Sequence, residues 1–265
     1  MRLRPRFRPV YAVLERELLR MFRQRTRLVA AMVRPLIWLL VIGGGFSALL
    51  GVEYQSFLVP GVLGMTMLFG AMLAALTTVY DKESGVMRML VIAPMPHAWI
   101  VIAKVASAAA AAMLQALLLL ALLAVLGYAG SGTRWGLLAA ALAATSLACA
   151  AIGMLTAAFS RSLDNFAGIM NFVIFPVFFL SGSLYPVRDL PPALGWIATA
   201  NPYTYGVDLL KHALLPHAAS ADFAVGLDFA VLALATAAAV AVASWRFSRE
   251  SAYEPMIHVL AGRAK

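Results

Sequence analysis

The 265-residue chain has a single cysteine, Cys149, and few charged residues. A lone cysteine in an apolar run excludes a disulfide framework and a Cys/His metal cluster, so we expect Cys149 to be a small packing residue. Charged residues make up 12% of the chain and apolar residues 63%, whereas soluble domains have about 25% and about 45–50%. This composition predicts a polytopic membrane protein.

Two motifs of nucleotide-binding and hydrolytic enzymes are also missing. The sequence has no Gly-x-x-x-x-Gly-Lys-Ser/Thr loop to hold phosphates and no Gly-x-Ser-x-Gly elbow to carry a nucleophile. Its histidines all fall outside the predicted spans, which leaves none for an intramembrane Ser/His hydrolase. The chain is therefore predicted not to be an enzyme. Its net charge of +9 does not indicate nucleic-acid binding, because the basic residues flank apolar runs.

Six apolar runs are candidates for membrane spans, since a helix needs about 20 apolar residues to cross a bilayer. With the N-terminus inside, most lysines and arginines fall on the cytoplasmic side, and only Arg134, Arg188 and Lys211 fall outside. By the positive-inside rule, both termini are predicted to be cytoplasmic. The predicted fold is an all-α polytopic membrane protein with a six-helix transmembrane domain over 28–245 and a cytoplasmic tail over 246–265. The predicted spans are residues 28–50, 57–80, 99–126, 135–159, 166–184 and 223–245.

The N-terminal segment, residues 1–27, combines arginines with apolar residues at helical spacing. After Pro9, the apolar positions Val10, Leu14, Leu18 and Met21 alternate with glutamate and arginine. Such a pattern is typical of an amphipathic helix lying in the membrane interface. We therefore predict an interfacial helix on the cytoplasmic side.

A polar stretch, residues 81–90, interrupts the apolar sequence between the second and third spans. Charges are costly in hydrocarbon, so this stretch is expected to lie in water, within a cytoplasmic loop over 81–96. Its apolar residues line one side of a short predicted helix, a pattern that suits docking into a groove on another protein. The pattern alone is equally compatible with a solvated turn between the two spans. The apolar residues are Val86, Met87, Met89 and Leu90.

The fifth span ends in a segment that is rich in proline and aromatic residues. Residues 185–215 contain two apolar pieces that are too short to span, and prolines mark their ends. A plain extracellular loop would be more polar. We therefore predict two re-entrant half-helices that dip back from the outer face.

Small residues recur in the second span. Gly61, Gly64 and Gly70, followed by Ala71, Ala74 and Ala75, would let neighbouring helices approach closely.

Together these residues resemble the permease subunits of type-2 ATP-binding-cassette exporters, in the branch of drug-resistance and nodulation-factor exporters. The resemblance rests on the N-terminal helix, on the polar loop followed by Ala93-Pro94, and on the motifs from Phe175-Pro176 to Asn201-Pro202-Tyr203. It implies a homodimer in a bacterial inner membrane, working with two copies of a separate ATPase that binds the ATP and magnesium. This chain itself would bind no cofactor and no metal.

The resemblance also implies roles for particular residues in an exporter that works by alternating access. An aromatic stripe on the fifth span would line the dimer seam and cargo path, with lipid-facing phenylalanines as the alternative. The cargo would be amphipathic, drug-like, lipid or glycan, and an ion- or proton-coupled secondary transporter is the alternative function. The predicted sets are Asp81, Lys82, Glu83, Ser84, Gly85, Val86, Met87, Arg88 and Met89 for ATPase coupling, Phe172, Phe175, Phe178 and Phe179 for the seam, and Tyr185, Asn201, Pro202, Tyr203 and Tyr205 for an external gate.

Overall fold

The computed structural model describes residues 15, 33–51, 53–85, 97–130, 132–215 and 221–262. Every regular element within these ranges is a helix, in agreement with the predicted all-α class. The predicted N-terminal helix lies outside the described residues, apart from residue 15. The apolar residues of the polar stretch, which begin at position 86, also lie outside the described residues.

Ten helices follow one another along the described part of the chain. Their bounds are η1 Trp38–Gly43 (a π-helix), α3 Gly44–Leu50, α4 Glu53–Glu83, α6 His97–Val125, α7 Trp135–Phe159, α8 Leu163–Phe179, η2 Val187–Asp189 (a 3-10 helix), α9 Pro192–Ala200, α10 Pro202–Leu214 and α11 Val225–Gly262.

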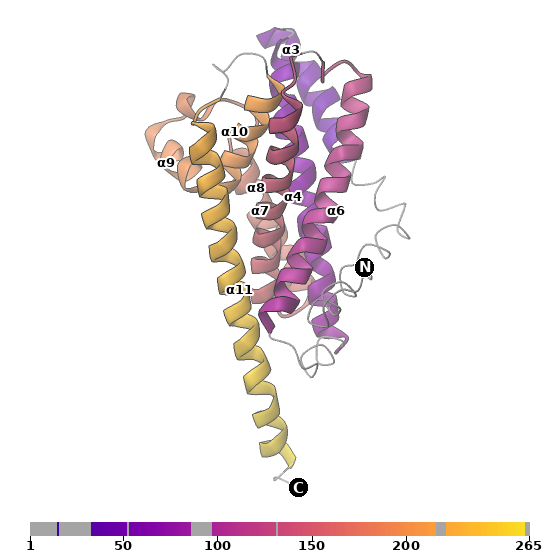
Figure 1. Ribbon diagram of the computed structural model, residues 1–265, viewed down its shortest axis with the longest axis vertical. Coiled ribbons are helices and arrows are strands. Elements are labelled where there is room, and N and C mark those ends of the chain that lie inside the picture. The colour runs from indigo at the N-terminus through magenta and orange to yellow at the C-terminus, as the bar shows by residue number, and fades with distance from the viewer. Residues whose placement is uncertain are drawn as a thin grey trace.

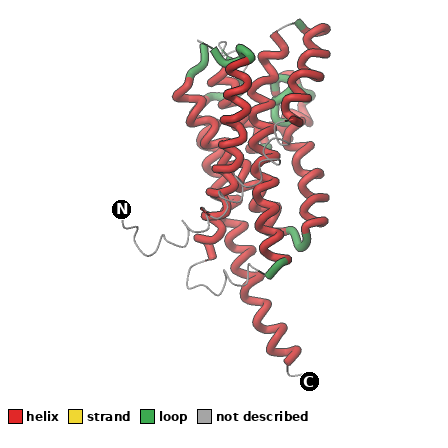
Figure 2. Tube along the Cα trace, turned by 90° about the vertical axis from the view of Figure 1, so that its right-hand side faces the viewer, coloured by secondary structure: helices red, strands yellow, loops and turns green. Residues whose placement is uncertain are grey.

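The long helices run side by side along the longest axis of the molecule (Figures 1 and 2). α4 packs against α6, α7, α8 and α10, while α7 also contacts α11 and α10. α9, α10 and the start of α11 gather at one end of this bundle, and the C-terminal part of α11 extends beyond its other end (Figure 1). The two ends therefore differ: one is capped by short helices, and the other is where α4 ends.

Four described helices are long and apolar enough to cross a membrane: α4, α6, α7 and α11. The predicted first and fifth spans appear as shorter apolar helices, Val33–Ser47 and Leu163–Phe179. At 1.5 Å per residue, α8 is about 26 Å long, somewhat short of the roughly 30 Å hydrocarbon core. Six spans thus stay a prediction, while four candidate spans are observed.

Two predicted boundaries differ from the structure. The fifth span was expected to reach residue 184, but α8 ends at Phe179, and Gly182, three residues further on, has a left-handed backbone conformation with a φ of 73°. Ser181 donates a hydrogen bond to the Phe178 carbonyl and holds this turn. The last helix is longer than predicted: α11 continues past the predicted end at residue 245 to Gly262.

Small residues in α4 do allow close packing, as predicted. A Cβ atom at Gly64 would lie 2.5 Å from the hydroxyl of Tyr203 on α10, and one at Gly61 would lie 2.5 Å from the carbonyl oxygen of Ser183. Cys149 is fully buried in α7 among apolar side chains, which fits the expected packing role. At Gly64, α4 therefore packs closely on Tyr203 of α10, and a side chain at this position would displace the Tyr203 ring.

Candidate functional site

The last turn of α4 holds a buried ion pair. Lys104 Nζ of α6 lies 2.6 Å from Asp81 Oδ2, and both side chains are at most 3% exposed. We expected the charges of the polar stretch to lie in water, and for Asp81 this expectation is wrong. The pair explains the difference, because an opposite charge at hydrogen-bond distance offsets the cost of leaving water.

The next two residues of α4 contact the ends of two other helices. Lys82 Nζ donates to the carbonyls of Ala157 and Ala158 at 3.1 Å each, in the last turn of α7, where backbone carbonyls lack helical partners. Lys82 Nζ also lies 4.6 Å from the ring centroid of Phe247 on α11. Glu83 accepts a hydrogen bond of 2.9 Å from the Leu163 amide at the start of α8, where a negative charge is favourable.

Asp81, Lys82, Glu83 and Lys104 are called the α4-end cluster below. The cluster connects the end of α4 to α6, α7, α8 and α11. Of the predicted ATPase-coupling residues, Glu83 and Ser84 are exposed here, and Gly85 turns the chain with a φ of 75°. Val86, Met87, Arg88 and Met89 lie outside the described residues, so their predicted contact stays a prediction.

The predicted aromatic stripe divides into an outward and an inward part. Phe172 is 81% exposed and Phe175 is 49% exposed, on a surface of α8 that no described helix covers. Phe179 stacks on Phe175, with ring centroids 6.1 Å apart. Phe178 instead points into the bundle, where it is 2% exposed and meets the edge of Trp38. Only the outward part is available to a second copy or to lipid.

The residues of the predicted external gate lie near the end of α8 and fasten α9 and α10 to it. Asn201 caps α10 by accepting from the Tyr203 amide, and its side-chain nitrogen donates to the Val177 carbonyl at 2.7 Å. Pro202 occupies the first position of α10, where a missing amide hydrogen costs nothing. The Tyr205 hydroxyl donates to the Thr199 carbonyl of α9 at 2.8 Å.

Tyr185 and Tyr203 complete this set. The Tyr185 hydroxyl donates to the Phe179 carbonyl, the last residue of α8. Tyr203 is 1% exposed and packs on α4. The structure therefore brings the five residues together, and their role as a gate stays a prediction.

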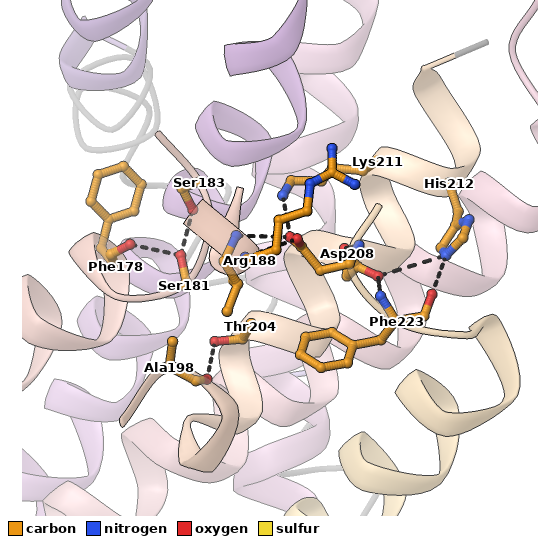
Figure 3. A network of polar contacts seen from close by, with 12 residues as sticks. Phe178, Ser181, Ser183, Arg188, Ala198, Thr204, Asp208, Lys211, His212 and Phe223 are labelled. Atoms are coloured by element: carbon orange, nitrogen blue, oxygen red, sulfur yellow. Dashed lines mark hydrogen bonds and ion pairs between the residues drawn. The ribbon is translucent and has the colours of Figure 1, made fainter. Parts of the chain in front are cut away.

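A second polar cluster joins α10 to the chain that leads into α11 (Figure 3). Asp208 accepts hydrogen bonds from the amides of Asp222 at 2.8 Å and Phe223 at 2.9 Å. Lys211 Nζ lies 3.2 Å from Asp222 Oδ2, and His212 Nε2 contacts the Phe223 carbonyl at 2.9 Å. Burial raises the pKa of the Asp208 carboxyl, and the two amide hydrogen bonds work against that rise.

Asp208, Lys211, His212 and Asp222 are called the α10 cluster. Sequence reasoning placed Lys211 outside the membrane and named none of the others as site residues. A signal was available, because residues three and four apart share one helix face, and Asp208 lies at these spacings from Lys211 and His212. Asp222 was not recognisable in this way, since it reaches the cluster from a connecting segment.

Comparisons with known proteins agree on one family. Residues 8–215 match the model described as ABC-2 type transporter. Nodulation protein J of Rhizobium leguminosarum bv. trifolii is 30% identical over 199 residues, which cover 72% of this chain and 74% of that protein. Putative transport permease ycf38 of Porphyra purpurea is 24% identical over 213 residues, covering 77% and 72%. Inner membrane transport permease YadH of Escherichia coli (strain K12) is 23% identical over 176 residues, covering 66% and 68%.

Four long apolar helices and these relatives define a multi-pass membrane transport permease. The chain belongs to the ABC-2 type transporter family, in the branch that includes Nodulation protein J. The resemblance inferred from the sequence is thus confirmed.

Proposed function

We propose that the chain is the membrane subunit of an ATP-driven exporter in the bacterial cytoplasmic membrane. In this proposal two copies form the translocation path, and two copies of a separate ATPase bind at the end of the bundle where α4 ends. Both termini and the loop over 81–96 are then cytoplasmic, and α9 and α10 form a re-entrant external segment. The shorter helices Val33–Ser47 and α8 supply the remaining two of six spans.

The α4-end cluster is the observation that carries this proposal. Three consecutive residues of α4 contact α6, α7 and α8, and one of them also contacts α11. A displacement of the loop that follows Glu83 would therefore act on four other helices at once. An exporter powered by a separate chain needs such a connection between its cytoplasmic loop and its spans.

Transport then follows by alternating access. ATP binding closes the two ATPase subunits, the loop after α4 moves with them, and the two copies separate on the outer side. The exposed rings of Phe172 and Phe175 favour an amphipathic cargo that is drug-like, lipid or glycan. The ion- or proton-coupled alternative has no support from the comparisons, because the matching family model describes ABC-2 type transporters.

A crosslinking experiment tests the ATPase docking site. Ser84 is exposed just beyond α4, and the only native cysteine can be removed by Cys149→Ala. In that background, Ser84→Cys should crosslink to a co-expressed ABC ATPase through a short thiol-to-amine reagent. The matched control is Leu126→Cys, which is 51% exposed at the opposite end of the bundle.

The expected result is a permease–ATPase adduct from Ser84→Cys and none from Leu126→Cys. Equal adduct from both positions, or an adduct from Leu126→Cys alone, would remove the docking assignment. Absence of any adduct while the ATPase still co-purifies would place the contact elsewhere on the chain.

A further inference from the structure

Asp208, His212 and Asp228 bring three potential metal ligands together where α10 meets the first turn of α11. One ligand atom from each residue lies within 4.8 Å of the other two. Asp208 and His212 are one turn apart on α10, and Asp228 comes from α11. The group thus draws its donors from two helices.

Asp228 is the independent observation that points to a ligand. Its side chain is 0% exposed, and neither carboxylate oxygen has a hydrogen-bond partner among the described residues. Buried carboxylates are normally paired or coordinated, because leaving water without compensation is costly. The unpartnered carboxylate faces the donor atoms of Asp208 and His212.

The charges around this position favour a cation. Asp208, Asp222 and Asp228 provide three carboxylates, and Lys211 is the charged lysine that contacts one of them, at 3.2 Å. The Asp222 carboxylate also accepts hydrogen bonds from the backbone amides of Val187 and Arg188. Figure 3 also draws Arg188 in this cluster, so three carboxylates face two basic side chains, and the net charge that a cation would offset is negative.

We propose that Asp208, His212 and Asp228 bind a divalent transition-metal ion of the zinc type. One imidazole nitrogen with two carboxylate oxygens is a donor set found at zinc sites, and imidazole disfavours magnesium and calcium. His212 Nε2 now donates its hydrogen to the Phe223 carbonyl. Binding the ion through this nitrogen would replace that hydrogen bond and shift the ring hydrogen to Nδ1.

The ion would link α10 to the start of α11, because its ligands come from both helices.

A surface pocket of about 360 Å³ lies beside the cluster and is lined in part by Trp196, Asp222 and Phe223. His212 is partly exposed, with 13% of its side chain accessible. Solvent therefore reaches the imidazole edge of the site, which gives an ion a route of entry.

Metal retention by the full chain tests this proposal. The protein is purified in nanodiscs with a non-histidine affinity tag, stripped with chelator, incubated with Zn²⁺, desalted and analysed by elemental mass spectrometry. We expect about one zinc ion per chain in the wild type. Asp228→Asn and His212→Ala should each retain roughly a tenth of that or less, because each removes one of three ligands. Mg²⁺ in place of Zn²⁺ should not be retained.

Asp164→Asn is the matched control, since Asp164 is an exposed carboxylate in the first turn of α8. It should retain zinc at the wild-type level. Zn²⁺ should also raise the unfolding midpoint of the wild type and of Asp164→Asn, but not of Asp228→Asn. Each variant is checked by size exclusion, and if one ligand variant does not fold, the other decides. The proposal is overturned if the wild type retains no zinc, or if a folded ligand variant retains as much as the control.

Discussion

Removal of one partner from the Asp81–Lys104 pair should destabilise the protein strongly. Lys104→Met keeps an unbranched side chain of similar length but removes the ammonium group that lies 2.6 Å from the Asp81 carboxylate, which is 2% exposed. Breaking a buried ion pair in this way costs about 3–5 kcal/mol. At about 2–4 °C per kcal/mol, the unfolding midpoint should fall by roughly 6–20 °C.

The double variant Asp81→Leu/Lys104→Met separates the charge effect from simple loss of packing. Replacing both charges by apolar side chains removes the ion pair as a whole, so most of the lost stability should return. The unfolding midpoint of both variants is measured in nanodiscs, from the loss of helical circular dichroism at one fixed heating rate. Asp164→Asn again serves as an exposed control.

Two outcomes would refute this reasoning. If Lys104→Met unfolds within a degree or two of the wild type, Asp81 is not buried as a charge. If the double variant is as unstable as Lys104→Met, the instability comes from packing and not from an unpaired carboxylate.

Two further predictions concern packing in α4 and α8. Gly64→Leu should lower expression and the unfolding midpoint, because the leucine side chain would meet the Tyr203 hydroxyl. The control Gly136→Leu should lower neither, because the space around its Cβ is open. Similar losses in both variants would contradict the close approach of α4 and α10. Phe178→Ala should cost about 3–5 kcal/mol in the same unfolding assay because its ring is buried, and Phe172→Ala should cost much less. Equal costs would mean that the two rings have similar surroundings.

The lengths of the central helices could be predicted well from the sequence. The predicted spans at 99–126 and 135–159 lie close to α6, His97–Val125, and α7, Trp135–Phe159. Their continuous apolar composition and flanking polar residues determine these limits. The end of α8 was harder to predict, because the turn at Gly182 depends on a local hydrogen bond from Ser181 to the Phe178 carbonyl.

The candidate site was predictable only in part. The polar stretch after the second span could be recognised, but the partner of Asp81 could not, because Lys104 was read as one more cytoplasmic charge. A lysine inside an apolar helix was a signal for a buried partner, and only the packing of α6 on α4 identifies that partner. Asp228 lies near the start of the predicted sixth span, yet its position beside α10 depends on how the two helices meet.

The most direct test of the central proposal is a distance between the two copies in the complex with the ATPase. Spin labels attached at Phe172→Cys in a Cys149→Ala background would lie on the exposed surface of α8. We predict one inter-copy distance distribution without nucleotide and a shifted one with trapped Mg-ATP. An unchanged distribution in a complex that hydrolyses ATP, or no measurable inter-copy distance, would contradict the account.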